Sequence, residues 1–80
     1  MHGIVAREEN RIEVVMPPGT DISLYPATFD GFSRAGWEVW VLVPTEMLGS
    51  AHRHLRGVEV TLQPWWEAGN GVLFGRPEIP

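Results

Sequence analysis

The chain has 80 residues, of which 44% are hydrophobic, and its formal net charge is −4. This size and composition predict a single small globular domain over residues 1–80 and exclude a disordered chain. The absence of cysteine excludes disulfides and cysteine-ligated zinc. The longest apolar run, residues 39–43, is far shorter than the about 18 residues that span a bilayer, so we expect no membrane partner.

Two further features bear on location and partners. Residues 1–8 have neither a basic start nor a long apolar core, so we expect no secretory signal and a cytoplasmic location. All six cations are Arg and the chain is acidic overall. Binding along a nucleic-acid backbone needs a field of many cations, so nucleic acid is not the expected partner.

The first elements predicted are two strands, at residues 4–7 and 11–16, joined by a hairpin loop at residues 8–10. In the second strand Ile12, Val14 and Met16 share one face. Residues 17–19 read Pro-Pro-Gly and end this strand, because proline cannot donate a hydrogen bond to a neighbouring strand and glycine permits a turn.

A helix at residues 26–35 and a strand at residues 37–43 follow. Phe29, Phe32 and Ala35 recur at helical spacing, and Gly36 provides a C-terminal cap. The strand is a run of β-branched and aromatic residues, which is typical of a central position in a sheet.

The second predicted helix covers residues 45–56. Thr45 suits its N-cap and Gly57 ends it. Its apolar stripe predicts which face packs on the core, and it consists of Met47, Leu48, Ala51 and Leu55.

Two more strands complete the chain, at residues 58–63 and 72–76, separated by a turn at residues 67–71. We therefore predict an α/β (α+β) fold of order β-β-α-β-α-β-β. Right-handed crossovers would place both helices on one face of a mixed sheet with strand order 1-2-3-4-5, giving a two-layer sandwich. A β-grasp-like arrangement is the alternative, because hairpin–helix–strand also opens that fold.

The sheet face away from the helices carries the candidate site. If Trp37, Val39, Val41 and Val43 face the helices, then Glu38, Trp40 and Leu42 lie on the open face, beside Thr61 of the next strand. Exposed apolar residues there would mark an interface or a ligand groove. The alternative is that Trp65 or Trp66, or the C-terminal segment, folds over these residues and buries them.

One dense basic patch, formed by His52, Arg53, His54 and Arg56, ends the second helix. Residues two apart on a helix point about 200° apart, so His52 and His54 are not expected to share a metal ion. Cations are favoured at a helix C-terminus, and we interpret the patch as a solvated helix end. Ser50 and His54 lie one turn apart but have no third catalytic partner in the sequence.

These observations predict no catalytic residue, cofactor or metal. The leading hypothesis is a non-enzymatic binding module that self-associates or docks a protein partner through the open face, at Trp40, Leu42, Glu38 and Thr61. The alternative is an enzyme or small-ligand domain with a groove around Trp40, Thr61 and Glu59. A flat apolar patch would favour the first hypothesis, and a concave pocket the second.

Overall fold

The computed structural model describes residues 5–8 and 10–80. Residue 4 of the first predicted strand and residue 9 of its loop lie outside this range. The elements alternate as predicted: strands β1 (Val5–Glu8), β2 (Arg11–Val15), β3 (Glu38–Pro44), β4 (Thr61–Ala68) and β5 (Gly71–Phe74), α-helices α1 (Pro26–Arg34) and α2 (Leu48–His54), and 3₁₀ turns η1 (Ile22–Leu24) and η2 (Thr45–Met47).

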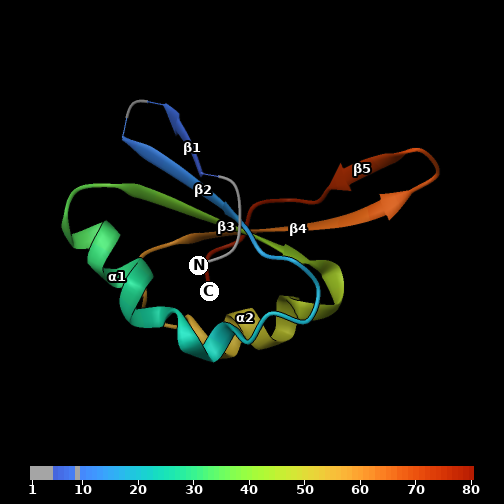
Figure 1. The fold of residues 1–80 in the computed structure, drawn as a ribbon. Coiled ribbons are helices and arrows are strands. Elements are labelled where there is room, and N and C mark those ends of the chain that lie inside the picture. Colours follow the sequence, from blue (N-terminus) through green and yellow to red (C-terminus); the bar gives the residue numbers. More distant parts are fainter. Residues whose placement is uncertain (1–4, 9) are drawn as a thin grey trace.

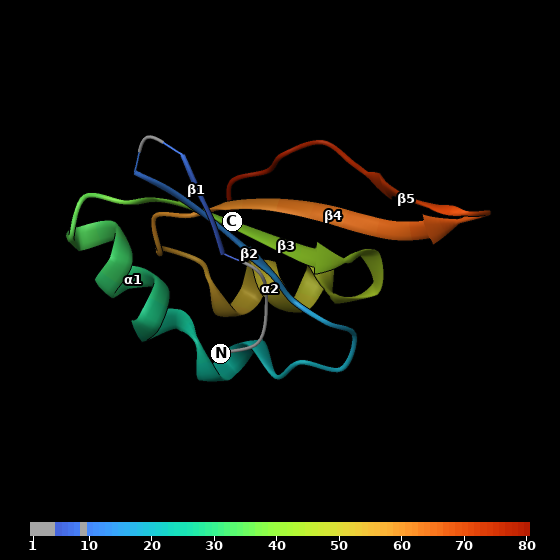
Figure 2. The same cartoon turned by 45° about the horizontal axis from the view of Figure 1, so that its top comes forward.

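The strands form one sheet in the order β1-β2-β3-β4-β5. The two outer pairs are antiparallel hairpins, and β3 runs parallel to both β2 and β4. Both helices lie on the same side of this sheet (Figure 1, Figure 2). The predicted fold class, a two-layer α+β sandwich with a mixed sheet, is therefore confirmed, and the β-grasp alternative is not the fold observed.

The core lies between the sheet and the two helices. Val39, Val41 and Val43 of β3 are no more than 2% exposed, as the alternation of this strand predicted. Phe29 of α1 and Leu55, which follows α2, are fully buried against them. The remaining core residues come from β2, η1, α2 and the β4 region: Ile12, Val14, Met16, Ile22, Ala51, Val60 and Leu62.

The second helix is shorter than predicted. Residues 45–47 form a 3₁₀ turn, and the α-helix begins at Leu48. Thr45 does not cap it, because its hydroxyl donates a hydrogen bond to the Trp65 carbonyl, 3.2 Å away on β4. Two residues of the predicted apolar stripe, Ala51 and Leu55, are buried, whereas Met47 and Leu48 are half-buried at its edge.

The largest difference from the prediction concerns β4, which runs over residues 61–68 instead of 58–63 and continues through Pro64. A proline inside a strand lacks the N–H that pairs with the neighbouring strand. Here the Pro64 nitrogen faces Gly75, and the Gly75 carbonyl accepts a hydrogen bond from the Gln63 side-chain amide at 3.0 Å instead. In return the Gly75 N–H donates to the Pro64 carbonyl at 2.8 Å.

The last segment of the chain continues along the same edge of β4. Leu62 and Glu78 exchange both backbone hydrogen bonds, each at 2.7 Å. Since Gly75 lies opposite Pro64 and Glu78 opposite Leu62, two residues, Arg76 and Pro77, face Gln63 alone. This arrangement is a β-bulge, and it ends the regular strand β5 earlier than the predicted residue 76.

Truncating the core at either side of the sandwich tests this packing. We expect Leu55→Ala and Val41→Ala each to lower the free energy of unfolding by about 2–4 kcal/mol, through lost transfer energy and the cavity left behind. The measurement is a denaturant titration. Midpoints equal to that of the wild type would contradict the placement of these side chains in the core.

Adding one methyl group at residue 75 tests the contact that joins the C-terminal segment to β4. A Cβ at Gly75 would lie 2.8 Å from Cγ of Pro64, whereas a Cβ at Gly71 meets nothing within 4 Å. We expect Gly75→Ala to cost about 1–3 kcal/mol of stability and Gly71→Ala to change it little. Equal unfolding midpoints for the two variants would contradict the close approach of Pro64 and Gly75.

Candidate functional site

The predicted site residues lie together on the open sheet face, the side without helices. Trp40 of β3 is paired with Thr61 of β4, so the two side chains are neighbours on this face. The guanidinium of Arg11, on β2, lies 3.9 Å from the centre of the Trp40 ring. The Trp40 indole N–H donates to the Glu38 carboxylate, and Arg11 also pairs with Glu13 at 3.1 Å.

This end of the open face is therefore polar. Trp40 is half-buried beneath Arg11, and Leu42 is only 5% exposed. Of the two alternatives left open for Leu42, exposure and internal cover, exposure is wrong. Alternation along a strand shows which face a side chain points to and says nothing of what lies over that face. Trp40, Leu42, Glu38 and Thr61 share a face as predicted, but they do not form an exposed apolar patch.

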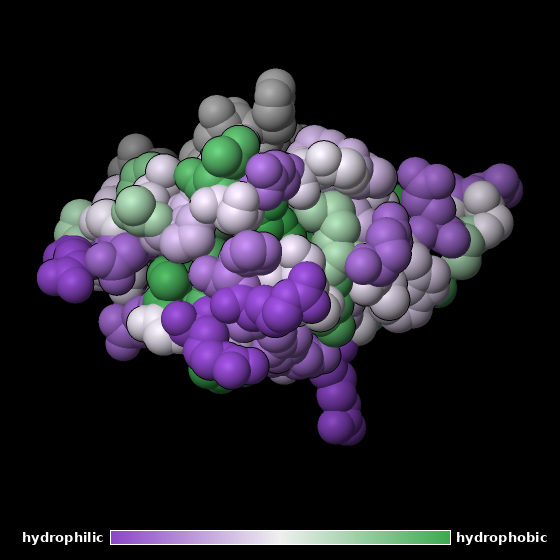
Figure 3. All heavy atoms as spheres, turned by 90° about the horizontal axis from the view of Figure 1, so that it is seen from below, coloured by the Kyte–Doolittle hydropathy of each residue, from purple (hydrophilic) through white to green (hydrophobic). Residues whose placement is uncertain are grey.

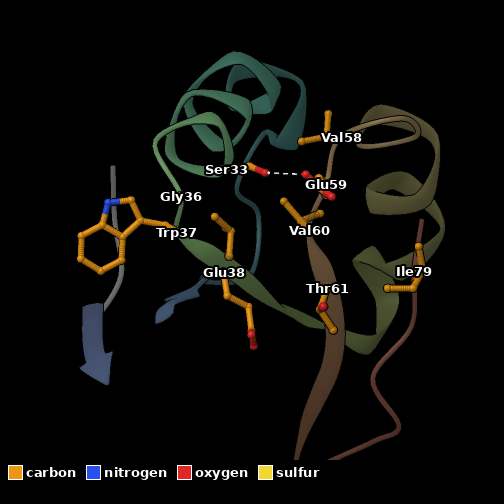
Figure 4. Close-up of a pocket in the computed structure, with 10 residues that line it drawn as sticks. Ser33, Gly36, Trp37, Glu38, Val58, Glu59, Val60, Thr61 and Ile79 are labelled. Carbon is orange, nitrogen blue, oxygen red and sulfur yellow. Dashed lines mark hydrogen bonds between the residues drawn. The ribbon is translucent and has the colours of Figure 1, made fainter. Parts of the chain in front are cut away.

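The predicted groove corresponds in part to a hollow of about 430 Å³. Thr61 and Glu59 line it as predicted, together with Glu38 and Ile79, whereas Trp40 is not part of its wall. Figure 4 shows that it lies between the end of α1, the starts of β3 and β4, and the C-terminal segment, which contributes Ile79. The Ser33 hydroxyl donates to the Glu59 carboxylate at 3.1 Å across one end of the hollow.

The chemistry that this hollow offers is limited. The residues that line it include one serine and two carboxylates, and neither histidine nor lysine is among them. A serine nucleophile needs an adjacent base and an oxyanion site, and a carboxylate that only accepts the serine hydrogen bond does not form such a set. The arrangement is suited to binding a polar or cationic group rather than to acyl transfer.

The predicted basic patch does not act as one group. Nε2 of His52 lies 2.7 Å from the Glu78 carboxylate, so this side chain contacts the C-terminal segment. His54 is exposed at the end of α2. Hydrogen bonds from the Ser23 hydroxyl and backbone N–H lower the pKa of the Asp21 carboxyl, with a smaller electrostatic contribution from His54. Arg53 and Arg56 are exposed, as expected of a solvated helix end.

Within residues 5–8 and 10–80, no three or more His, Asp or Glu side chains gather in a way that would hold a metal ion. In the same part of the chain, neither α-helix has the length and apolar character needed to cross a bilayer.

The sequence prediction missed a group of exposed apolar side chains that lie close together on one hairpin. Four residues of the β4–β5 hairpin are between 39% and 54% exposed, and we call them the hairpin patch: Trp66, Val72, Leu73 and Phe74. Trp66 is paired with Leu73, and Trp65 with Phe74. The signal in the sequence is the run Val-Leu-Phe directly after Gly-Asn-Gly, since three successive apolar residues on an edge strand expose at least one of them.

The hairpin patch lies beyond the two layers of the sandwich. The pairing of β4 with β3 ends at Trp65, so in the part of the chain that the structure describes residues 66–68 pair with β5 alone. This two-stranded end extends past the helices (Figure 2). Seen from the helix side, hydrophilic residues gather over the middle of the molecule, with smaller separate hydrophobic areas (Figure 3).

Comparison with known proteins adds no assignment to this geometry. No protein-family model, curated protein or solved structure matches the chain.

Proposed function

We propose that this chain is a non-enzymatic binding module that contacts itself or another protein through the hairpin patch. The observation that carries the proposal is an exposed apolar hairpin end whose last part, residues 66–68, pairs with β5 alone among the described strands. An exposed apolar cluster of this kind is typical of a protein–protein contact. The hairpin patch has two sides. Alternation along β4 and β5 places Val72 and Phe74 on the same side as Trp40 and Leu42, and it places Trp66 and Leu73 on the opposite side.

The energetics of a two-stranded ribbon support this proposal. An isolated hairpin is marginally stable in water at best, and it gains stability when a third strand or another surface packs against it. The indole N–H of Trp65, where the ribbon begins, is buried and has no acceptor among the described residues. A partner that covers the hairpin would remove from water the apolar area that stays exposed in the single chain.

The composition supports the same class of function. Trp and Phe are the residues that contribute most area at protein interfaces, and three of the aromatic side chains lie on this hairpin: Trp65, Trp66 and Phe74. A cytoplasmic location is part of the proposal.

A second candidate function is the binding of a small polar or cationic ligand. The hollow of about 430 Å³ beside Glu59 and Thr61 favours it. We place it second because the hollow has few polar groups that converge on one point, whereas ligand sites usually combine an apolar pocket with several such groups.

Photo-crosslinking tests the leading proposal. The photoreactive residue p-benzoylphenylalanine is introduced in place of Phe74, and as a matched control in place of Leu24, which is 69% exposed on η1 far from the hairpin in the chain. We expect irradiation of living cells to yield protein adducts from position 74 and few from position 24, because only the hairpin patch is a contact surface. Adducts that are absent at both positions, or equal at both, would contradict the proposal.

A further inference from the structure

We propose that the partner of the hairpin patch is a second copy of this chain, which pairs its β5 with the β5 strand of the first copy about a two-fold axis. This inference rests on the proposed function and specifies its partner and geometry. Two copies would then form one continuous sheet of ten strands, twice the five of the single chain. The register of the pairing follows from the backbone of β5.

The free edge of β5 presents a defined set of backbone groups. In an antiparallel pair, alternate residues direct their N–H and C=O toward the partner strand. The Gly75 N–H donates to the Pro64 carbonyl, so Pro64 and Gly75 are a hydrogen-bonded pair. In the same register the next hydrogen-bonded pair, two residues along, is Trp66 with Leu73. The hydrogen-bonded positions of β5 are therefore Gly71, Leu73 and Gly75, and Val72 and Phe74 direct their N–H and C=O away from β4, at the edge of the sheet.

The outward N–H and C=O groups of Val72 and Phe74 can bond to the same groups of a second copy that is related by a two-fold axis. If Leu73 lies on the axis, Val72 of each copy faces Phe74 of the other, and the two pairs form four hydrogen bonds. The same register places Leu73 beside Leu73 of the second copy, flanked by the two Trp66 side chains on one face. On the other face each Val72 meets a Phe74, so apolar side chains adjoin across the whole contact.

The C-terminal continuation of this edge has features that prevent pairing with another strand, and β5 lacks them. Natural edge strands are protected by proline, bulges and charged residues. The C-terminal continuation of the edge has all three, at Arg76, Pro77 and Glu78. Gly71–Phe74 has none of them. An uncharged strand also lets two chains of formal net charge −4 approach without like charges at the contact.

The short length of this edge predicts a weak, concentration-dependent dimer. Contacts that bury less than about 1,200 Å² belong to the transient class of interfaces. A two-fold contact closes at the dimer, whereas pairing of β5 with β1 of another copy would repeat and produce longer assemblies.

Cysteine cross-linking measures the register directly, because the natural chain has no cysteine. In the proposed dimer the two Leu73 residues form a non-hydrogen-bonded pair with Cα atoms about 4.5 Å apart, which is within the range of a disulfide. The two Val72 residues lie diagonally, about 7–8 Å apart, which is outside that range. We expect Leu73→Cys to form disulfide-linked dimers at least about tenfold faster than the matched control Val72→Cys.

The mass of the wild type is measured in parallel by sedimentation equilibrium from about 10 µM to about 1 mM, and we expect a monomer–dimer equilibrium. Faster cross-linking of Val72→Cys would indicate stacking through the open face and would overturn the inference. Absence of cross-linking in both variants, a monomer throughout, or a mass that grows beyond the dimer would also overturn it. The proposed function is judged separately, since adducts of position 74 with a different protein would still support it.

Discussion

The parallel pairing of β3 with β2 and β4 is the interaction on which the rest of this structure depends. Each parallel pair requires a crossover, and right-handed crossovers that step the same way across the sheet place α1 and α2 on one face. The core then lies between β3 and these helices, with Val39, Val41 and Val43 buried at its centre. The hairpin strands β1 and β5 are left at the two edges, where no crossover covers them.

The unusual surface of the molecule follows from the unequal lengths of β3 and β4. β3 ends at Pro44, opposite Trp65, but β4 continues to Ala68, where β5 is the one described strand that pairs with it. Pro64 does not end β4 because Gly75 gives its ring room and the Gln63 side chain replaces the missing backbone donor. The contact between Pro64 and Gly75 therefore has two consequences. It lets the hairpin extend past the core, and it places the β-bulge of Arg76 and Pro77 directly after β5 on the same sheet edge.

Local patterns predicted the fold well, because apolar alternation in β3 and helical spacing in α1 and α2 each reflect burial against the same core. The extent of β4 was not predictable in this way. Proline usually ends a strand, and its tolerance at Pro64 depends on Gly75, which lies eleven residues away in the chain and is adjacent only after folding.

The site was predictable only as a face of the sheet. Alternation placed Trp40 and Leu42 on the open side, but the Arg11 guanidinium that covers Trp40 comes from another strand and is a tertiary contact. The hairpin is exposed because it extends past the helices that cover the rest of the sheet. The alternation of residues within a strand does not predict how far the helices extend.

The central claim is that the backbone of β5 is satisfied on one side by β4 and on the other by a second chain. Amide hydrogen exchange of single residues as a function of protein concentration tests it most directly, because protection reports whether each N–H is hydrogen-bonded. We expect the Leu73 amide to be protected at every concentration, whereas the Val72 and Phe74 amides should exchange rapidly in dilute protein and become protected as concentration rises. Rapid exchange of Val72 and Phe74 at all concentrations would contradict it.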